Sequence, residues 1–338
     1  MTTRHYQLAA GNERARLQAS TRTLSALAPT QIQIRVGAAS LNYRDLLVRQ
    51  MQGDNRANLT PLSDAAGTVV AVGSAVTRWR EGDRVSPGFF AAWINGAFKS
   101  HHMPSALGGG QTDGVLGEVI VAEETAVVAV PQHLSLAEAA SLPCAGVTAW
   151  HALFERGHLQ EGDTVLVQGT GGVAMIALQL ASAHGAKVIV TSSSDEKLAR
   201  ADQLGAWKTI NYREHANWDQ VALELTNGEG VDHILELGGP DTYTRSLNAI
   251  GYGGRIAQIG VLSGFDAAPH ITPMQFKNAS INGICVGSVA HYTRLNQFIS
   301  QHQIHPLIDQ TFAYDDAEAA YSALAGAQHF GKLVINVT

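Results

Sequence analysis

TVLVQGTGGVAMIALQL, residues 164–180, gives the clearest indication of fold class in this sequence. Its first five residues form a short apolar run, which is typical of a strand buried on both faces of a parallel sheet. A glycine-rich turn follows and opens directly into an apolar helix, which we expect over residues 173–184 with Gly185 as its C-terminal stop. Strand, turn and helix in this order predict the first half of a βαβ unit.

The turn reads GTGGVA over residues 169–174 and fits the pattern G-x-G-x-x-A. Gly169 lets the chain turn sharply, Gly171 leaves room for a pyrophosphate, and small Ala174 lets the helix pack on the strand. Free N–H groups at a helix start also favour phosphate, so the context disfavours an ordinary glycine turn. The residues predicted to bind a dinucleotide here are Gly169, Thr170, Gly171, Gly172 and Val173.

Strands and helices continue to alternate downstream of this unit. We expect further strands at KVIVT (187–191), KTINY (208–212), VDHILEL (231–237) and RIAQIG (255–260), with INGICVG (281–287) as an edge strand. This alternation predicts an α/β fold with a doubly wound parallel sheet, the Rossmann arrangement.

The first 125 residues or so follow a different pattern. Short β segments such as QIQIRV (31–36), GTVVAVG (67–73), GDRV (82–85) and GEVIVAE (117–123) predict a twisted, mostly antiparallel, barrel-like domain. Residues 103–114 are expected to form a surface loop, either a connector or a lid.

The tail after residue 289 predicts helices near 293–302 and 315–325 and a final strand at 332–337, which we expect to return to the first domain. The predicted domains are therefore residues 1–145 with 289–338, and residues 146–288.

Composition narrows the class of protein. The 338 residues carry a net charge of −6 without blocks of like charge, which argues against a nucleic-acid partner. Two cysteines exclude a disulfide framework and a multi-cysteine zinc lobe. No apolar run approaches the roughly twenty residues of a membrane span, and the N-terminus lacks the apolar core of a signal peptide. We therefore expect a cytoplasmic protein without a membrane partner.

The end of the second strand indicates which dinucleotide is bound. NAD-binding folds usually carry Asp or Glu there, whereas this chain has Ser192, followed by Ser193 and Ser194. Serine hydroxyls and Lys197 can bind the 2′-phosphate of NADP, which a carboxylate would repel. We expect Asp195 to face the start of the next helix. The prediction is NADP(H), and a serine-rich turn without 2′ preference is the alternative.

Several segments together resemble the medium-chain dehydrogenase/reductase family over almost the whole chain. They include LNYRDLLVR (41–49), PLSDAAGTVVAVGSAV (61–76), LPCAGVTAWHAL (142–153) and HFGKLVI (329–335). The sequence is most similar to the zinc-free, quinone-oxidoreductase-like branch. The resemblance implies a GroES-like catalytic domain beside the Rossmann domain, and a homodimer formed through the edge strand near residues 281–287.

The resemblance also assigns cofactor contacts. It places Lys197 and Tyr212 beside the 2′-phosphate, with Arg213 as a further candidate, and Lys332 near the pyrophosphate. Positions that would line the ribose and nicotinamide are Thr148 and the turns containing Leu237, Gly260 and Val261.

The zinc-binding branch of the family uses Cys, His and Cys as catalytic ligands, and the matching positions here are Asn42, Ser63 and Cys144. An amide and a serine hydroxyl are poor zinc ligands, so we expect no metal. A different site built from Asp64 and the pair His101-His102 is an alternative without supporting ligand spacing.

Without a metal, hydrogen-bond donors must stabilise the oxygen that gains charge when a hydride reaches a carbonyl or enone. The candidate catalytic residues are Asn42, Tyr43 and Asp45 of the N-Y-R-D segment, in which Arg44 could pair only with Asp45. The same segment could equally be a helix start capped by Asn42. Aromatic residues that could line a substrate pocket or simply form core are Phe89, Phe90, Trp93 and Trp150.

These observations predict an NADPH-dependent, zinc-independent reductase of a small quinone, enone or other carbonyl compound. An alcohol dehydrogenase that works in the oxidative direction is an alternative. A dinucleotide-binding protein with negligible turnover, of the crystallin type, is another.

Overall fold

The computed structural model describes residues 2–10, 14–51, 58–266 and 269–338. The chain divides into two compact units. The first unit comprises Met1–Val147 and Val286–Thr338, and the second comprises Thr148–Cys285. The boundaries expected from the sequence were 145/146 and 288/289. Within the described ranges, no helix has both the length and the apolar character needed to cross a bilayer.

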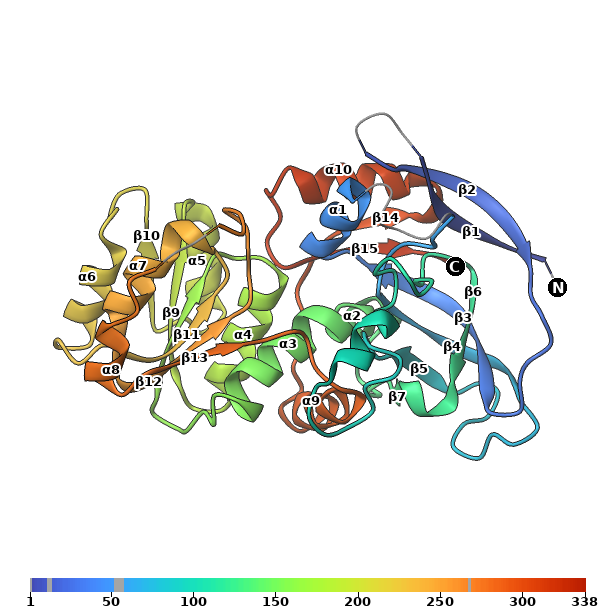
Figure 1. Ribbon diagram of the computed structural model, residues 1–338, viewed down its shortest axis with the longest axis horizontal. Helices are drawn as coiled ribbons and strands as arrows, with labels where there is room; N and C mark the ends of the chain where they lie inside the picture. Colours follow the sequence, from blue (N-terminus) through green and yellow to red (C-terminus); the bar gives the residue numbers. More distant parts are fainter. Residues whose placement is uncertain (1, 11–13, 52–57, 267–268) are drawn as a thin grey trace. The chain divides into compact units, whose positions relative to one another are not determined.

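The second unit is built on a six-stranded parallel sheet, coloured from light green to orange in Figure 1. Its strand order is β10-β9-β8-β11-β12-β13, which confirms the doubly wound arrangement. The strands are β8 (Thr164–Gln168), β9 (Lys187–Ser192), β10 (Lys208–Asn211), β11 (Val231–Glu236), β12 (Ile250–Gln258) and β13 (Ser280–Gly283).

Five helices accompany this sheet: α4 (Gly172–Ala183), α5 (Asp195–Gln203), α6 (Trp218–Leu225), α7 (Pro240–Ala249) and α8 (Pro273–Lys277). Apolar side chains of β8, β11, β12, α6 and α7 share one buried cluster, in which Leu166, Ala222 and Ile234 are fully buried. The apolar run of β8 is thus buried, as predicted from the sequence of residues 164–168.

The first unit contains a seven-stranded sheet in the order β14-β15-β3-β4-β5-β7, with β6 paired to β3. Only β14 and β15 run parallel; the other pairs in this sheet are antiparallel. The strands are β3 (Gln31–Ser40), β4 (Asp64–Val72), β5 (Arg84–Pro87), β6 (Val119–Glu123), β7 (Val127–Ala129), β14 (Ile308–Ala313) and β15 (Lys332–Asn336). The predicted return of the final strand is confirmed, because β15 pairs with β3.

Helices of the first unit are α1 (Tyr43–Gln50), α2 (Leu136–Ala140), α9 (Val289–His302) and α10 (Ala317–Ala325). The first unit also contains the 3₁₀ helices η1 (Ser100–Ser105), η2 (Glu124–Ala126) and η5 (Tyr314–Asp316) and the π-helix η3 (Leu142–Gly146). The chain passes into the second unit through α3 (Val147–Trp150) and η4 (His151–Glu155).

Two features were missed and two predicted bounds are wrong. The antiparallel pair of β1 (Thr2–Ala9) and β2 (Arg16–Thr23) was not predicted, because most β2 side chains are polar and at least partly exposed. Strand β14 was also missed. Strand β13 ends at Gly283 rather than reaching residue 287, and the predicted loop 103–114 begins within the 3₁₀ helix η1.

Candidate active site

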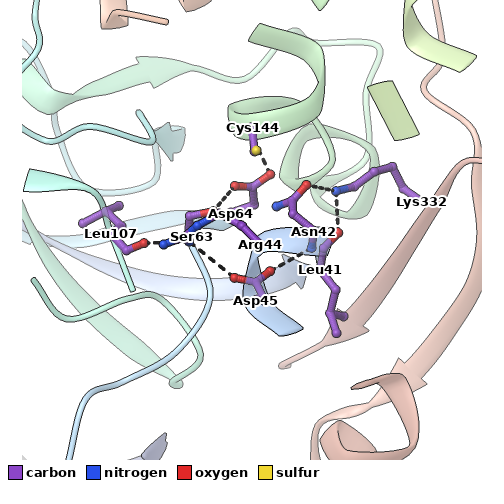
Figure 2. Close-up of polar contacts among 9 residues, drawn as sticks. All are labelled: Leu41, Asn42, Arg44, Asp45, Ser63, Asp64, Leu107, Cys144 and Lys332. Carbon is purple, nitrogen blue, oxygen red and sulfur yellow. Dashed lines mark hydrogen bonds and ion pairs between the residues drawn. The ribbon is translucent and has the colours of Figure 1, made fainter. Parts of the chain in front are cut away.

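The N-Y-R-D segment forms the start of helix α1, with Asn42 at the N-cap position. The Asn42 backbone N–H donates to Asp45 Oδ2 at 2.7 Å, so Asp45 closes the first turn. The Asn42 side chain does not cap the helix. Its Oδ1 instead accepts a hydrogen bond from Lys332 Nζ at 2.6 Å (Figure 2). The backbone of Asn42 therefore begins helix α1, whereas its side-chain amide takes no part in capping the helix.

Lys332 is the first residue of β15, and the pairing of β15 with β3 brings it to the chain that leads into α1. Its ammonium group also donates to the Leu41 carbonyl at 2.6 Å, and the side chain is only 3% exposed. The Asn42 Nδ2 atom is buried and has no hydrogen-bond partner in the described part of the chain.

Asp45 is a buried carboxyl group, 1% exposed. Burial raises the pKa of Asp45 to about 6, although the Arg44 guanidinium acts in the opposite direction. Arg44 Nη1 lies 3.3 Å from Asp45 Oδ1 and donates to the Leu107 carbonyl at 3.0 Å. Arg44 therefore anchors α1 locally, whereas Tyr43 is 41% exposed.

Ser63, Asp64 and Cys144 form a second polar group beside Asn42 (Figure 2). The Ser63 hydroxyl donates to Asp64 Oδ1 at 2.5 Å, and the Cys144 backbone N–H donates to Asp64 Oδ2 at 3.0 Å. Burial raises the pKa of the Cys144 thiol, which keeps the thiol protonated. Both Asp64 oxygens are therefore satisfied by the protein.

These residues do not fit a catalytic zinc ion. The Asn42 oxygen is bound by Lys332 and the Ser63 hydroxyl is bound to Asp64, and neither an amide nor a serine hydroxyl is a good zinc ligand. No group of three or more His, Cys, Asp or Glu side chains able to hold a metal occurs among the described residues.

In the second unit, the turn between β8 and α4 has the expected backbone. Gly169 has φ +76, a conformation that favours glycine, and Gly171 is the N-cap of α4. A Cβ built on Gly171 would meet no protein atom within 4 Å. The chain itself therefore does not demand glycine at 171, in keeping with a ligand approaching there. Gly172 and Val173 follow in the first turn of α4, Thr170 is 6% exposed and Ala174 is fully buried.

The tip of β9 brings the predicted 2′-phosphate residues together. Ser192 is 4% exposed, and its carbonyl accepts the Tyr212 N–H at 3.0 Å, which places Tyr212 beside it. Ser192 Oγ accepts the Ser194 N–H, and Ser194 Oγ accepts the Lys197 N–H as the cap of α5. Ser193 lies between them and is partly exposed. Asp195 lies in the first turn of α5, where its Oδ1 accepts from Asn211.

Two residues that sequence reasoning missed, Gln168 and Glu236, organise the turns after β8 and β11. Glu236 is fully buried and accepts from Gln168, Thr242, Ser246 and the backbone N–H groups of residues 238 and 239. Gln168 Oε1 accepts the Leu237 and Gly238 N–H groups at 3.0 Å. A carboxylate at the end of an otherwise apolar strand was the available signal.

The turn after β12 lies against this network. The Gly260 N–H donates to the Glu236 carbonyl at 2.9 Å, and the Ser263 hydroxyl donates to the Gly238 carbonyl. Leu237, Gly260 and Val261 are thus brought together at the ends of neighbouring parallel strands, where such folds bind ligands. Thr148, by contrast, is buried within α3.

The four aromatic candidates are all buried. Phe89, Phe90 and Trp93 lie in the first unit, where Phe89 and Phe90 meet edge to face with ring centres 4.7 Å apart. Trp150 stacks on Phe154 in the second unit, and its Nε1 donates to Glu155. Core packing, the second of the two interpretations, accounts for these contacts.

Comparison with known proteins agrees with this organisation. The chain matches a family model described as an alcohol dehydrogenase GroES-like domain over residues 28–132, and a model described as a zinc-binding dehydrogenase over residues 172–301. It is 40% identical over 319 residues to a zinc-type alcohol dehydrogenase-like protein of Schizosaccharomyces pombe, covering 92% of each chain. A quinone oxidoreductase of Pseudomonas aeruginosa is 31% identical over 320 residues, covering 91% of each chain.

Among solved structures, a Sinorhizobium meliloti protein described as an alcohol dehydrogenase superimposes with a TM-score of 0.93. It is 40% identical to this chain, and the match covers 99% of both chains.

Proposed function

Since this chain belongs to the medium-chain dehydrogenase/reductase family, we propose that it is an NADPH-dependent oxidoreductase that reduces a quinone, enone or other carbonyl compound without zinc. The observation that carries the proposal is the buried Asn42 amide, whose Nδ2 has no partner in the described structure and stands where a zinc ligand would be expected.

NADP(H) is the proposed cofactor because hydroxyl groups, rather than a carboxylate, occupy the end of β9. Ser192 and Tyr212 lie side by side, and Ser193, Ser194 and Lys197 follow within one turn. The turn 169–173 and residues 237, 260 and 261 would hold the rest of the dinucleotide. When bound, the nicotinamide supplies the hydride.

The protein's own contribution to the chemistry is stabilisation of the substrate oxygen. Asn42 Nδ2 offers two N–H groups and needs an acceptor, which a carbonyl oxygen that gains negative charge provides. Tyr43 is exposed and could donate to the same oxygen or pass a proton from solvent. Asp45 holds the Asn42 backbone in place.

Zinc independence is proposed from the chemistry of the donor set. Making the Asn42 oxygen a ligand would require Lys332 to release it, and the Ser63 hydroxyl is already bound to Asp64. A site built from Cys, His and Cys ligands would not carry the cost of displacing a lysine.

We also propose a homodimer formed through β13. In the part of the chain that the structure describes, β13 pairs only with β12 and leaves its other edge open. Large apolar side chains are exposed near it, including Ile281 at 40% and Phe276 at 73%. An open strand edge beside apolar side chains favours pairing with a second copy. Light scattering of wild type and Ile281→Lys should show a dimer and a monomer respectively.

Steady-state assays with NADPH and NADH, run side by side over a panel of quinones, enones, ketones and aldehydes, test the main proposal. We expect turnover with NADPH that survives chelator treatment, in protein without stoichiometric zinc. Activity that depends on zinc would refute metal independence. Faster turnover of alcohols with oxidised cofactor would favour the oxidative alternative. Tight NADPH binding without turnover over the panel would favour a non-catalytic binding protein.

A further inference from the structure

We infer that Lys332 is a positioning residue, which holds the Asn42 amide so that its N–H groups, and not its oxygen, face the substrate. The inference rests on the proposed function and adds a second component to the same site. The resemblance stated above places Lys332 near the cofactor pyrophosphate, so the two roles predict different behaviour of the same variant.

The chemistry of the contact fixes which way the amide points. A lysine ammonium group can only donate hydrogen bonds, whereas a side-chain amide carries one acceptor and one donor atom. The Asn42 atom 2.6 Å from Lys332 Nζ must therefore be Oδ1, and Nδ2 must lie on the other side of the amide.

In the described part of the chain, no acceptor forms a hydrogen bond with Nδ2. The neighbouring Asp64 carboxylate already accepts from the Ser63 hydroxyl and the Cys144 N–H, and Asp45 accepts from the Asn42 backbone and Arg44 (Figure 2). An unsatisfied donor in a buried position is costly, and an acceptor atom on a bound ligand would remove that cost. A substrate oxygen is the acceptor that would satisfy it.

Lys332 is also anchored so that it cannot easily leave the amide. Its ammonium donates to the Leu41 carbonyl as well as to Asn42, and its side chain is 3% exposed. A positive charge on the oxygen side of an amide polarises the amide and strengthens its N–H groups as donors. The lysine thus both orients and activates the group that meets the substrate.

The central test is a double-mutant cycle with Lys332→Met, Asn42→Leu and the double variant, and with Lys208→Met as the matched control. Lys208 is exposed in the second unit, far along the chain from α1. Loss of one oxyanion donor typically lowers kcat by about 10²- to 10³-fold, and we expect a fall of that order in both single variants. Because Lys332 acts through Asn42, the double variant should be no slower than Asn42→Leu alone. The Kd for NADPH should change by less than about threefold.

Asn42→Asp is the second variant, chosen because it keeps an acceptor for Lys332 and so protects the fold. It lacks the N–H groups, and we expect folded protein that binds NADPH normally but has the low kcat of Asn42→Leu. Wild-type kcat in either Asn42→Asp or Lys332→Met would overturn the inference. So would a tenfold or larger rise in the NADPH Kd of Lys332→Met with kcat retained, which would make Lys332 a cofactor ligand.

An activity-free measurement separates this inference from the proposed function. The side-chain NH₂ signals of Asn42, assigned by their loss in Asn42→Leu, should shift in Lys332→Met and not in Lys208→Met. If wild type shows no turnover but these signals shift as expected, the proposed function fails and the positioning role stands. Unchanged signals in Lys332→Met would remove the positioning role whatever the activity.

Discussion

A Cβ atom built on Gly260 would lie 1.9 Å from the Leu237 carbonyl oxygen. The backbones that follow β11 and β12 therefore touch directly, and a side chain at 260 would push the two turns apart. The nearest obstacles are all backbone atoms of Leu237, which cannot rotate away as a flexible side chain would.

Gly260→Ala is accordingly expected to lower the free energy of unfolding by about 3 kcal/mol, a size typical of overpacking against atoms that cannot move away. Denaturant unfolding of the cofactor-free protein checks this value. A variant as stable as wild type would mean that these turns separate easily.

Gly171→Ala provides the contrasting case. A Cβ there meets no protein atom within 4 Å, so stability without cofactor should change by less than about 1 kcal/mol, the usual range for a helix N-cap substitution. The Kd for NADPH should nevertheless rise at least tenfold, because the added methyl would occupy the space that a pyrophosphate needs. Fluorescence titration of folded variant measures this, and unchanged affinity would place the pyrophosphate elsewhere.

Ser192→Asp tests the choice of dinucleotide. A carboxylate at the end of β9 would repel a 2′-phosphate and accept from a 2′-hydroxyl, so the NADPH Kd should rise about tenfold or more while the NADH Kd holds or falls. Gln203→Glu adds the same charge at the far end of α5 and should leave both constants unchanged. Equal NADPH affinity in wild type and Ser192→Asp would show that Ser192 is not beside the 2′-phosphate.

Asp45 predicts a dependence of stability on pH. Because burial raises the pKa of Asp45 to about 6 from the ordinary aspartate value of 3.8, the folded protein holds a proton that the unfolded chain has lost between these two pH values. The contribution of Asp45 to the free energy of unfolding therefore falls as the pH rises through that window, by about 2 kcal/mol between pH 4.5 and 7.

Asp45→Asn removes this titration. The stability of the variant relative to wild type should improve by that amount from pH 4.5 to 7, whatever constant offset the new amide introduces beside Arg44. Asp202→Asn, an exposed change, should show no such trend. A flat difference for Asp45→Asn would mean that Asp45 titrates as in the unfolded chain.

The sequence predicted the second unit well because its signals are local. The apolar run, glycine turn and helix of residues 164–180 lie next to one another, and the structure places β8 and α4 within one residue of the predicted bounds. Burial of each strand between helices leaves an apolar run that periodicity detects. The serine-rich end of β9 could also be located from the sequence, because it directly follows the apolar residues of that strand.

Other features depend on partners far away in the sequence. Strand β2 is mostly polar and is held by β1, and β14 is recognisable only through its pairing with β15. The hydrogen-bond network around Glu236 has no sequence signal beyond a single carboxylate at the end of an otherwise apolar strand. The contact between Asn42 and Lys332 joins residues 290 positions apart, so no local pattern could assign Lys332 its place beside the amide.

That separation has a consequence for how the protein is made. Asn42 leaves the ribosome early, but Lys332 follows only after the whole of the second unit has been translated. Until then the emerging first unit lacks both β15 and the ammonium group beside helix α1. The nascent chain can thus build the parallel sheet of the second unit before the contact between Asn42 and Lys332 exists, so the proposed site is completed only after that unit has been made.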